Sequence, residues 1–377
     1  MVAIVGYAVS NLEWDVNKTR EEAVFEVAKA ALKSAGISRE DVGTVISASS
    51  DFLDGRTISN CMLIGASGAY LRDESKAEED GLYAALYAIQ RLMAGVHDIA
   101  LVVAHTHSWI FNPHQVTRYM LEPWFDRQND MLDGITIAAL QMRMYMARHG
   151  VYEEDVAEVS VKNLRNASKI SHTFRKMPDV TVEDVLTSEV YAEPVTDLMI
   201  SPPCDGAAAV VIASDEAAKG FDDPVWVKGV GNACDSYLRD RDLARLTSLE
   251  IAARKAYRMA GIEEPFREID VAEITERFAH QEIMTYEALG FCRKGNGVRL
   301  LEEGMTEVYG DLPTNPSGGA LAGDPICATG LIRLIEAVRQ IRGEAENQVE
   351  DCRTALAHTQ WGIAAQKNLV LILGDEP

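Results

Sequence analysis

Several features are scarce in this chain of 377 residues, and each scarcity excludes a class of protein. Only 12 residues are proline and 47% are hydrophobic, which is typical of a globular chain and not of a disordered or fibrous one. The longest apolar runs, such as the one within 98–104, have the length of a strand and fall far short of the roughly 18 residues of a membrane helix. Residues 1–6 lack a basic segment and a cleavage site, so we expect a first strand there and not a signal peptide. These absences predict a cytoplasmic protein.

Positive charge is also scarce. The chain carries 36 Lys and Arg residues against 58 Asp and Glu residues, which gives a formal net charge of −22. Binding to nucleic acid or to an anionic membrane depends on Lys and Arg that neutralise phosphates, so both partners are disfavoured. A local basic patch remains compatible with a phosphorylated small molecule.

Cysteine is present but not patterned. The six cysteines are widely spread without a C-x-x-C pair, which argues against a disulfide framework and against a zinc ribbon in this chain. The loop with His105, His107 and His114 has no Cys, Asp or Glu interleaved at ligand spacing, so we expect polar loop histidines there. We therefore predict no metal in this chain, and any zinc would come from a partner.

A long-period duplication organises the chain. Strand 2–8, helix 19–35 and strand 41–47 resemble strand 225–230, helix 247–260 and strand 269–274. In both copies the sequence Ala-Gly-Ile follows the helix, with the glycine at a helix end that needs positive φ. Helix 81–93 with strand 98–104 likewise resembles helix 330–341 with strand 367–373. Each half therefore predicts an α/β unit with a buried sheet.

The duplication suggests the domain boundaries. We expect an N-terminal half over 1–215 and a C-terminal half over 222–377. The stretch at about 105–195 has no counterpart in the second half and carries helical patterns near 130–149 and 153–170. It is interpreted as an inserted loop region over the core, where lids and specificity loops usually occur.

Three stretches carry a resemblance to a known family. Residues 201–209 read SPPCDGAAA, residues 287–295 read EALGFCRKG, and residues 315–330 read NPSGGALAGDPICATG. The last resembles the Gly-His-Pro loop of the thiolase superfamily with its Asn-Pro-Ser-Gly-Gly lead-in, and the second resembles the sterol-carrier-protein-type branch. The resemblance implies a thiolase-like duplicated fold: two α/β halves, a layered αβαβα core and an inserted loop domain.

The resemblance also indicates catalytic positions, several of which are substituted. The nucleophilic cysteine of a thiolase lies three residues before the glycine that opens a helix, which here is Glu78 before Gly81. Asp324 stands in place of the Gly-His-Pro histidine, and the Asn-Glu-Ala-Phe-type loop reads TERF over 275–278 and supplies Glu276. The last catalytic loop, 358–362, reads HTQWG and keeps His358.

These substitutions suggest roles. Asp324 would be a base, His358 a donor to the thioester oxygen, Glu276 a residue that orients one of them or holds a water, and Glu78 a carboxylate at the cysteine position. Plain structural readings stay open beside these roles. They are helix capping by the acidic residues 78–80 and by Asp324, a core position for His280, a small buried thiol at Cys327, and packing roles for Cys204 and Cys292.

Coenzyme A is the ligand that the resemblance implies, as the thioester of an acyl substrate. Lys162 and Arg165 lie in a segment similar to the branch's helix near the CoA-covering loop, close to further basic residues. Ser317, Gly318 and Gly319 belong to the lead-in of the Gly-His-Pro-type loop. A solvated helix face would explain the same positive charges.

Three functions follow as hypotheses. A thiolase-like aldolase would cleave a β-hydroxyacyl-CoA by retro-aldol chemistry and needs no thiolate, which suits the missing cysteine. A thiolase-type acyl-CoA C-acyltransferase would perform Claisen chemistry with a partner subunit. A catalytically silent subunit would bind CoA or scaffold a complex in lipid metabolism. The resemblance further implies a homodimeric core and a partner subunit with a zinc ribbon and an OB fold.

Overall fold

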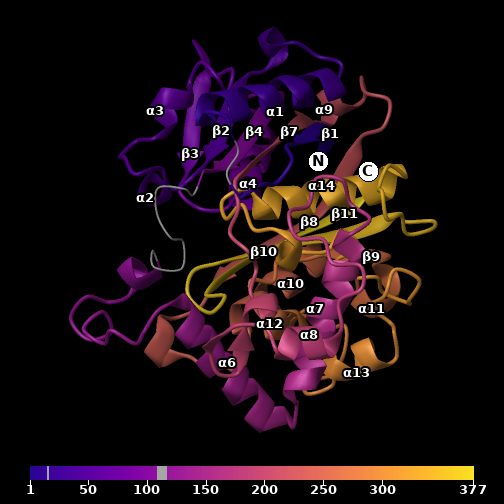
Figure 1. Ribbon diagram of the computed structural model, residues 1–377. Coiled ribbons are helices and arrows are strands. Elements are labelled where there is room, and N and C mark those ends of the chain that lie inside the picture. Colours follow the sequence, from indigo (N-terminus) through magenta and orange to yellow (C-terminus); the bar gives the residue numbers. More distant parts are fainter. Residues whose placement is uncertain (15–16, 108–116) are drawn as a thin grey trace.

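The computed structural model describes residues 1–14, 17–107 and 117–377 of the chain. Within them, the strands pair in the order β3-β2-β4-β7-β1-β8-β11-β10-β9 (Figure 1). These strands are β1 (Val2–Val9), β2 (Thr44–Ala48), β3 (Asp73–Ala77), β4 (Ile99–Thr106), β7 (Gly206–Ser214), β8 (Val225–Cys234), β9 (Val271–Glu273), β10 (Thr354–Trp361) and β11 (Lys367–Gly374). A separate two-stranded sheet joins β5 (Val190–Ala192) to β6 (Val195–Thr196).

Helices cover both faces of these strands and also lie between the two halves (Figure 1). The α-helices are α1 (Arg20–Ser34), α2 (Asp51–Asp54), α3 (Asn60–Leu63), α4 (Gly81–Met93), α6 (Gly134–His149), α7 (Glu153–Ala167), α8 (Val182–Leu186), α9 (Asp215–Ala218), α10 (Thr247–Ala260), α11 (Pro265–Glu268), α12 (Ala279–Ala288), α13 (Gly297–Glu302) and α14 (Thr329–Arg342). None of these helices has the combination of length and apolar character that a membrane crossing requires.

The two halves repeat one topology. In the N-terminal half β2 is parallel to β4, β4 antiparallel to β7, and β7 antiparallel to β1. In the C-terminal half β9, β10, β11 and β8 repeat this order and these directions. The halves meet where Ala3 pairs with Trp226 and Ile4 with Val225, so one sheet continues into the other at β1 and β8.

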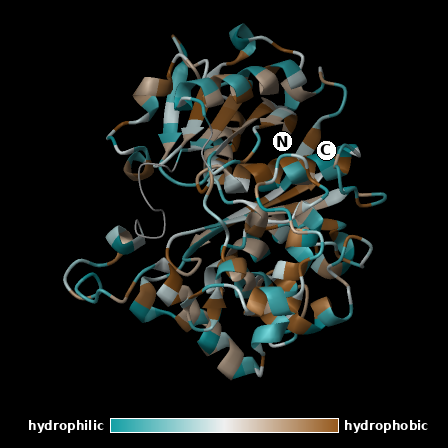
Figure 2. Cartoon of the chain, in the orientation of Figure 1, coloured by the Kyte–Doolittle hydropathy of each residue, from teal (hydrophilic) through white to brown (hydrophobic). Residues whose placement is uncertain are grey.

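The layers follow from the burial of each helix. Helix α4 is buried almost all round and contacts α14, so these two helices form the middle layer between the halves (Figure 1). Helix α1 covers the outer face of the first half, and α10 covers β8 and β11 of the second half. Hydrophobic residues gather on the strands and on the helix faces that meet them (Figure 2). This is the predicted duplicated α/β fold with an αβαβα order of layers.

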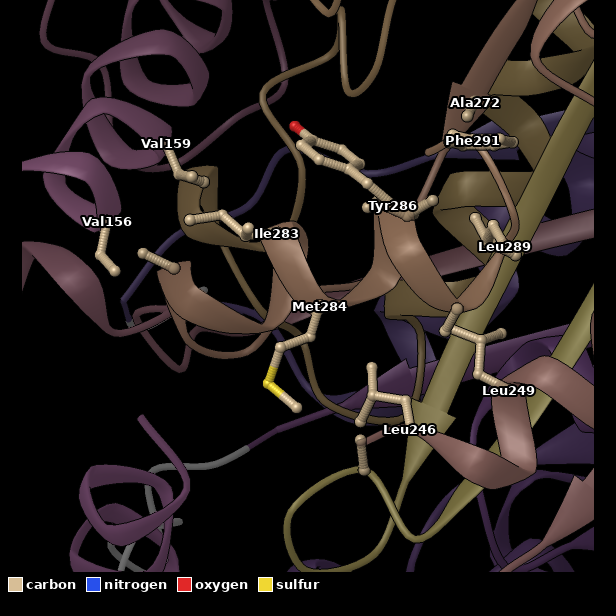
Figure 3. Packing of buried hydrophobic residues seen from close by; sticks show 14 of the residues in the cluster. Val156, Val159, Leu246, Leu249, Ala272, Ile283, Met284, Tyr286, Leu289 and Phe291 are labelled. Atoms are coloured by element: carbon tan, nitrogen blue, oxygen red, sulfur yellow. The ribbon is translucent and has the colours of Figure 1, made fainter. Parts of the chain in front are cut away.

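The helices of the inserted region pack with α10 and α12 in one hydrophobic core. Val156 and Val159 of α7 lie near Ile283 of α12, and Leu246 and Leu249, near the start of α10, lie on the side of Met284 and Leu289 in the same buried cluster (Figure 3). Every residue of α12 is buried, because the helix has neighbours on all sides. This packing fixes the segment that precedes α12, residues 275–278, which carries candidate site residues.

The predicted elements agree well with the structure except at one strand. Helices 81–93 and 247–260 have the predicted bounds, and Gly36 and Gly261 have φ values of 69° and 77°, as the predicted helix ends require. The segment around His358, expected to be a loop, is instead strand β10, which lies between β11 and β9. The counterpart of β4 is therefore β10, and β11 corresponds to β7, which corrects the pairing of 98–104 with 367–373.

Candidate active site

A cleft opens where loops from both halves meet the inserted region. Its empty volume is about 930 Å³, including its opening to solvent. The segment after β2, the turn before β7, the segment before α12, the loop before α14 and the end of β10 all contribute to its wall. The apolar part of the wall includes Leu53, Met120, Ile200, Phe278, Ile326, Trp361 and Ile363. The polar side chains in it include Ser201, Arg277, Gln281, Asp324 and Gln360.

Asp324 lines this cleft and is the one of the four predicted catalytic residues found among the described lining residues. One carboxylate oxygen, Oδ2, accepts a hydrogen bond of 3.0 Å from the Ser201 hydroxyl, and Oδ1 accepts one of 2.6 Å from the Thr329 hydroxyl. The backbone N–H of Asp324 donates to the carbonyl of Pro202 at 2.9 Å. The preceding Gly323 has a φ of 157°, and a Cβ at this position would lie 3.1 Å from Leu12 Cδ1 and 3.4 Å from Cys204 Sγ, so glycine suits it best. The carboxylate is thus fixed at the cleft wall.

Arg277 faces Asp324 across the same wall, and the sequence reasoning did not single it out. Its Nε lies 3.4 Å from Asp324 Oδ2, and one of its terminal nitrogens donates to the carbonyl of Ile326 at 3.2 Å. The guanidinium carbon lies 5.1 Å from the centroid of the Trp361 ring, at cation–π distance. The available signal was the TERF segment, in which arginine occupies the alanine position of the Asn-Glu-Ala-Phe-type loop.

Glu276, next to Arg277, points into the protein interior and not into the cleft. Its carboxylate accepts hydrogen bonds from the side-chain amides of Asn163 and Asn315 and from the backbone N–H of Leu321. Burial, together with the nearby charge of Glu282, raises the pKa of Glu276 well above its ordinary value. The contacts support a positioning function, because they anchor the segment that carries Arg277.

His358 is completely buried in β10 and is not among the residues that line the cleft. Its Nε2 shares a hydrogen bond of 2.9 Å with Asn368 Oδ1 of the neighbouring strand. Burial lowers the pKa of His358 to about 4, so the imidazole is neutral near pH 7. Its backbone carbonyl accepts from the N–H of Thr275 at 3.1 Å, which ties β10 to the segment before α12.

Glu78 lies just after β3, with about half of its side chain exposed. It accepts a hydrogen bond from the backbone N–H of Asp51 and pairs with Lys76 at 2.6 Å. Glu78 thus contacts the segment that contributes Leu53 to the cleft, but it is not among the described lining residues. Of the acidic residues 78–80, the helix cap is Asp80, the N-cap of α4.

Asp80 joins the two central helices. Its carboxylate accepts from the backbone N–H of Leu82 at 2.8 Å and from that of Gly330 at 2.7 Å, so it binds the N-termini of both α4 and α14. Burial raises its pKa to about 7. This contact holds the loop with Asp324 at a fixed distance from β3.

Four of the five residues predicted to bind CoA are buried, and Arg165 is exposed. The Lys162 ammonium is buried, 2.5 Å from Glu282 Oε1, and also donates to the carbonyl of Thr314 at 2.9 Å. Arg165 donates to the carbonyl of Val180. The remaining three, Ser317, Gly318 and Gly319, contact Glu273, Ala167 and Glu276. None of the five is among the described residues that line the cleft, and their role in CoA binding stays a prediction.

The histidines outside the cleft have structural partners. His280 shares a hydrogen bond with Gln141, and burial lowers its pKa to about 3, which matches the core reading. His105 lies 3.4 Å from Asp54, while His114 lies outside the described residues. The described part of the chain contains no group of three or more His, Cys, Asp or Glu side chains placed to hold a metal ion.

Comparisons with known proteins agree with this architecture. Residues 229–375 match the family model for the thiolase C-terminal domain. The acetyl-CoA acetyltransferase of Methanothermobacter thermautotrophicus is 32% identical over 96% of both chains. The steroid side-chain-cleaving aldolase of Thermomonospora curvata is 25% identical over 99% of this chain and 98% of its own. The solved structure of the Ltp2-ChsH2(DUF35) aldolase superposes with a TM-score of 0.85 at 21% identity, over 99% of this chain and 97% of the other.

The fold and the full-length similarity define the class of protein. The chain belongs to the thiolase superfamily. Over 57% of its length the chain is also 31% identical to the sterol carrier protein 2 of Oryctolagus cuniculus, of which that stretch covers 40%.

Proposed function

We propose that this chain cleaves the bond between the α and β carbons of a β-hydroxyacyl-CoA by a retro-aldol reaction, with Asp324 as the base. The observation that carries the proposal is a fixed carboxylate at the wall of a largely apolar cleft, held by Ser201 and Thr329 and paired with Arg277. An apolar cleft with a few convergent polar groups suits an acyl group and its reacting centre.

The proposed reaction starts at the substrate hydroxyl. Asp324 accepts the proton of the β-hydroxyl group, and the oxygen forms a carbonyl as the bond between the two carbons breaks. The released electron pair moves to the α carbon and onto the thioester oxygen as an enolate. Return of the proton to the α carbon gives a shortened acyl-CoA beside an aldehyde or ketone, so the reaction consumes no further reagent.

The surroundings of the cysteines support a mechanism without an acyl-enzyme. None of the described residues that line the cleft is a cysteine. The two nearest in sequence to its loops, Cys204 and Cys327, are buried, and burial raises the pKa of both thiols. A thiol with a raised pKa is a poor source of the thiolate that acyl transfer needs.

Replacing Cys327 by serine should therefore change the rate of β-hydroxyacyl-CoA cleavage less than threefold. The thiol packs against Leu53 behind the cleft, and serine keeps nearly the same volume. Steady-state assays of C327S and of iodoacetamide-treated wild-type protein measure this effect, with Cys61→Ser as a control at an exposed cysteine. Loss of turnover in C327S, with its thermal unfolding unchanged, would show that a cysteine carries the reaction.

Acyl transfer is the second candidate function. It is supported by full-length similarity to a protein named acetyl-CoA acetyltransferase, at 32% identity. In that reaction a β-ketoacyl-CoA and free CoA give two acyl-CoA thioesters, so the products distinguish it from the retro-aldol reaction. It requires a thiolate supplied from outside the described lining of the cleft.

We also propose the division of the chain into halves at 1–215 and 222–377, with an insertion at about 105–195. The repeated strand order β2-β4-β7-β1 and β9-β10-β11-β8 supports this division. The CoA part of the substrate would enter from the open side of the cleft, near Met120 and the inserted region.

We propose further that the chain forms a homodimer and works with a second subunit. Strand β3 lies at an edge of the sheet, and large apolar side chains near it are exposed, among them Met62, Tyr70 and Leu71. The name Ltp2-ChsH2(DUF35) describes a related fold in an aldolase of two components. Sedimentation of the purified chain should give twice the mass of 41.4 kDa, and a stable monomer at micromolar concentration would contradict the homodimer.

A further inference from the structure

We propose that Arg277 is a catalytic residue that binds the enolate oxygen formed from the thioester. We propose also that the acyl group of the substrate is uncharged. The inference rests on the proposed retro-aldol function and names the side chain that stabilises the enolate formed when the carbon–carbon bond breaks. Cleavage of the carbon–carbon bond places negative charge on the thioester oxygen, and that charge needs a donor inside the cleft.

The position of Arg277 suits this role. Its guanidinium lies at the cleft wall, with Nε 3.4 Å from Asp324 Oδ2. The proposed base and the cation are therefore neighbours in the cleft. The hydrogen bond to Ile326 and the stacking on Trp361 fix the plane of the guanidinium without substrate. A donor that is held in place before the reaction stabilises a developing charge without reorganisation.

The charge balance of the pair supports the same role. When Asp324 accepts the hydroxyl proton, it loses its negative charge, and Arg277 loses its counter-ion. At that moment the enolate forms and supplies a new negative charge. Arg277 is therefore paired before and during the reaction, and no uncompensated charge is left in the apolar cleft at either stage.

The same balance argues against a carboxylate on the acyl group as the partner of Arg277. Asp324 already neutralises Arg277. A substrate carboxylate near the pair would leave one excess negative charge among the side chains of Phe278, Ile326 and Trp361. We therefore infer that the cleft selects a neutral, hydrophobic acyl group.

The surroundings of His358 strengthen the assignment. His358, expected from the sequence to donate to the thioester oxygen, is buried in β10, bound to Asn368 and absent from the cleft lining. Arg277 instead carries a permanently charged group to that wall, supported from behind by the buried contacts of Glu276.

The test compares Arg277→Met and Arg277→Lys with wild type on two β-hydroxyacyl-CoA substrates of equal length, one with a methyl end and one with a terminal carboxylate. For the neutral substrate we expect R277M to lower kcat by about 10²–10³-fold, with KM changed less than threefold. R277K keeps the charge without the planar stacking group, so its kcat should fall between those of wild type and R277M. Arg299→Met, at an exposed arginine on α13, is the matched control and should retain wild-type rates.

Each outcome bears on a different claim. If wild type cleaves the neutral substrate and both variants keep its kcat, the inference is wrong while the proposed function stands. If wild type prefers the carboxylate substrate and R277M raises KM for that substrate alone, Arg277 binds a substrate carboxylate and the inference is overturned. Wild type that cleaves neither substrate would remove the proposed function itself. If R277M unfolds, the result for R277K decides between the roles. A kcat of R277K equal to that of wild type would then show that Arg277 stabilises the fold and does not bind the enolate.

Discussion

Replacing Asp324 by asparagine should lower kcat for cleavage of a β-hydroxyacyl-CoA by about 10²–10⁴-fold. Asparagine has the shape of aspartate, and its amide oxygen can replace one of the two carboxylate oxygens that accept from Ser201 and Thr329. It cannot accept a proton from the substrate, so the effect should appear in kcat and leave KM nearly unchanged. Single-turnover kinetics with saturating enzyme would measure it.

Two variants serve as controls for this result. Asp242→Asn removes a carboxylate that pairs with Arg148 away from the cleft, and it should retain the wild-type rate. Ser201→Ala removes one hydrogen bond to Asp324 and leaves the base in place, so its rate should fall far less than that of D324N. A D324N protein that is folded and within threefold of the wild-type rate would show that Asp324 is not the base.

Replacing Lys162 by methionine should lower the free energy of unfolding by about 3–5 kcal/mol, because it leaves a buried carboxylate without its counter-charge. The ammonium is 2.5 Å from Glu282 Oε1, and both side chains are almost fully buried. Glu276 lies in the same cluster, with its raised pKa, so the loss of the lysine leaves two neighbouring acidic groups. Denaturant unfolding followed by circular dichroism measures the change.

A second substitution separates stability from ligand binding at this position. Lys162→Met combined with Glu282→Gln removes both charges and should recover most of the lost stability. Lys169→Met, at an exposed lysine that contacts Asn347, should cost little. If K162M instead keeps wild-type stability and raises KM for the CoA thioester, Lys162 binds CoA as the family resemblance implies.

The order of the elements was predictable from the sequence because the repeat, the helix ends and the buried strands leave local signals. Strand β10 was not, because His358, Thr359 and Gln360 form a polar run that looks like a loop. All three are buried; His358 bonds to Asn368, 10 positions away on the neighbouring strand, and Gln360 bonds to Gln281, 79 positions away. A strand with buried polar side chains next to one another carries no alternation of polar and apolar residues to detect.

The candidate site was predictable only in part, for a similar reason. Asp324 follows from its place in a loop motif, and the structure puts it at the cleft. Lys162 looked like part of an exposed basic cluster because its partner, Glu282, lies 120 positions away. Arg277 was not predicted, because the residues that place it at the cleft, Trp361 and Asp324, contact it only in the folded chain. Pairings over such separations are decided by the fold and leave no local pattern.

The central claim is that this chain breaks a carbon–carbon bond by retro-aldol chemistry, and product analysis of the wild-type protein tests it most directly. The purified chain, with any copurifying subunit, is incubated with a panel of neutral β-hydroxyacyl-CoA and β-ketoacyl-CoA substrates, the latter with free CoA, and the products are identified by mass spectrometry. We predict an aldehyde or ketone and a shortened acyl-CoA from the hydroxy substrates, lost in D324N. Two acyl-CoA thioesters from the keto substrates, with the hydroxy substrates unchanged, would contradict the account and assign the chain to acyl transfer.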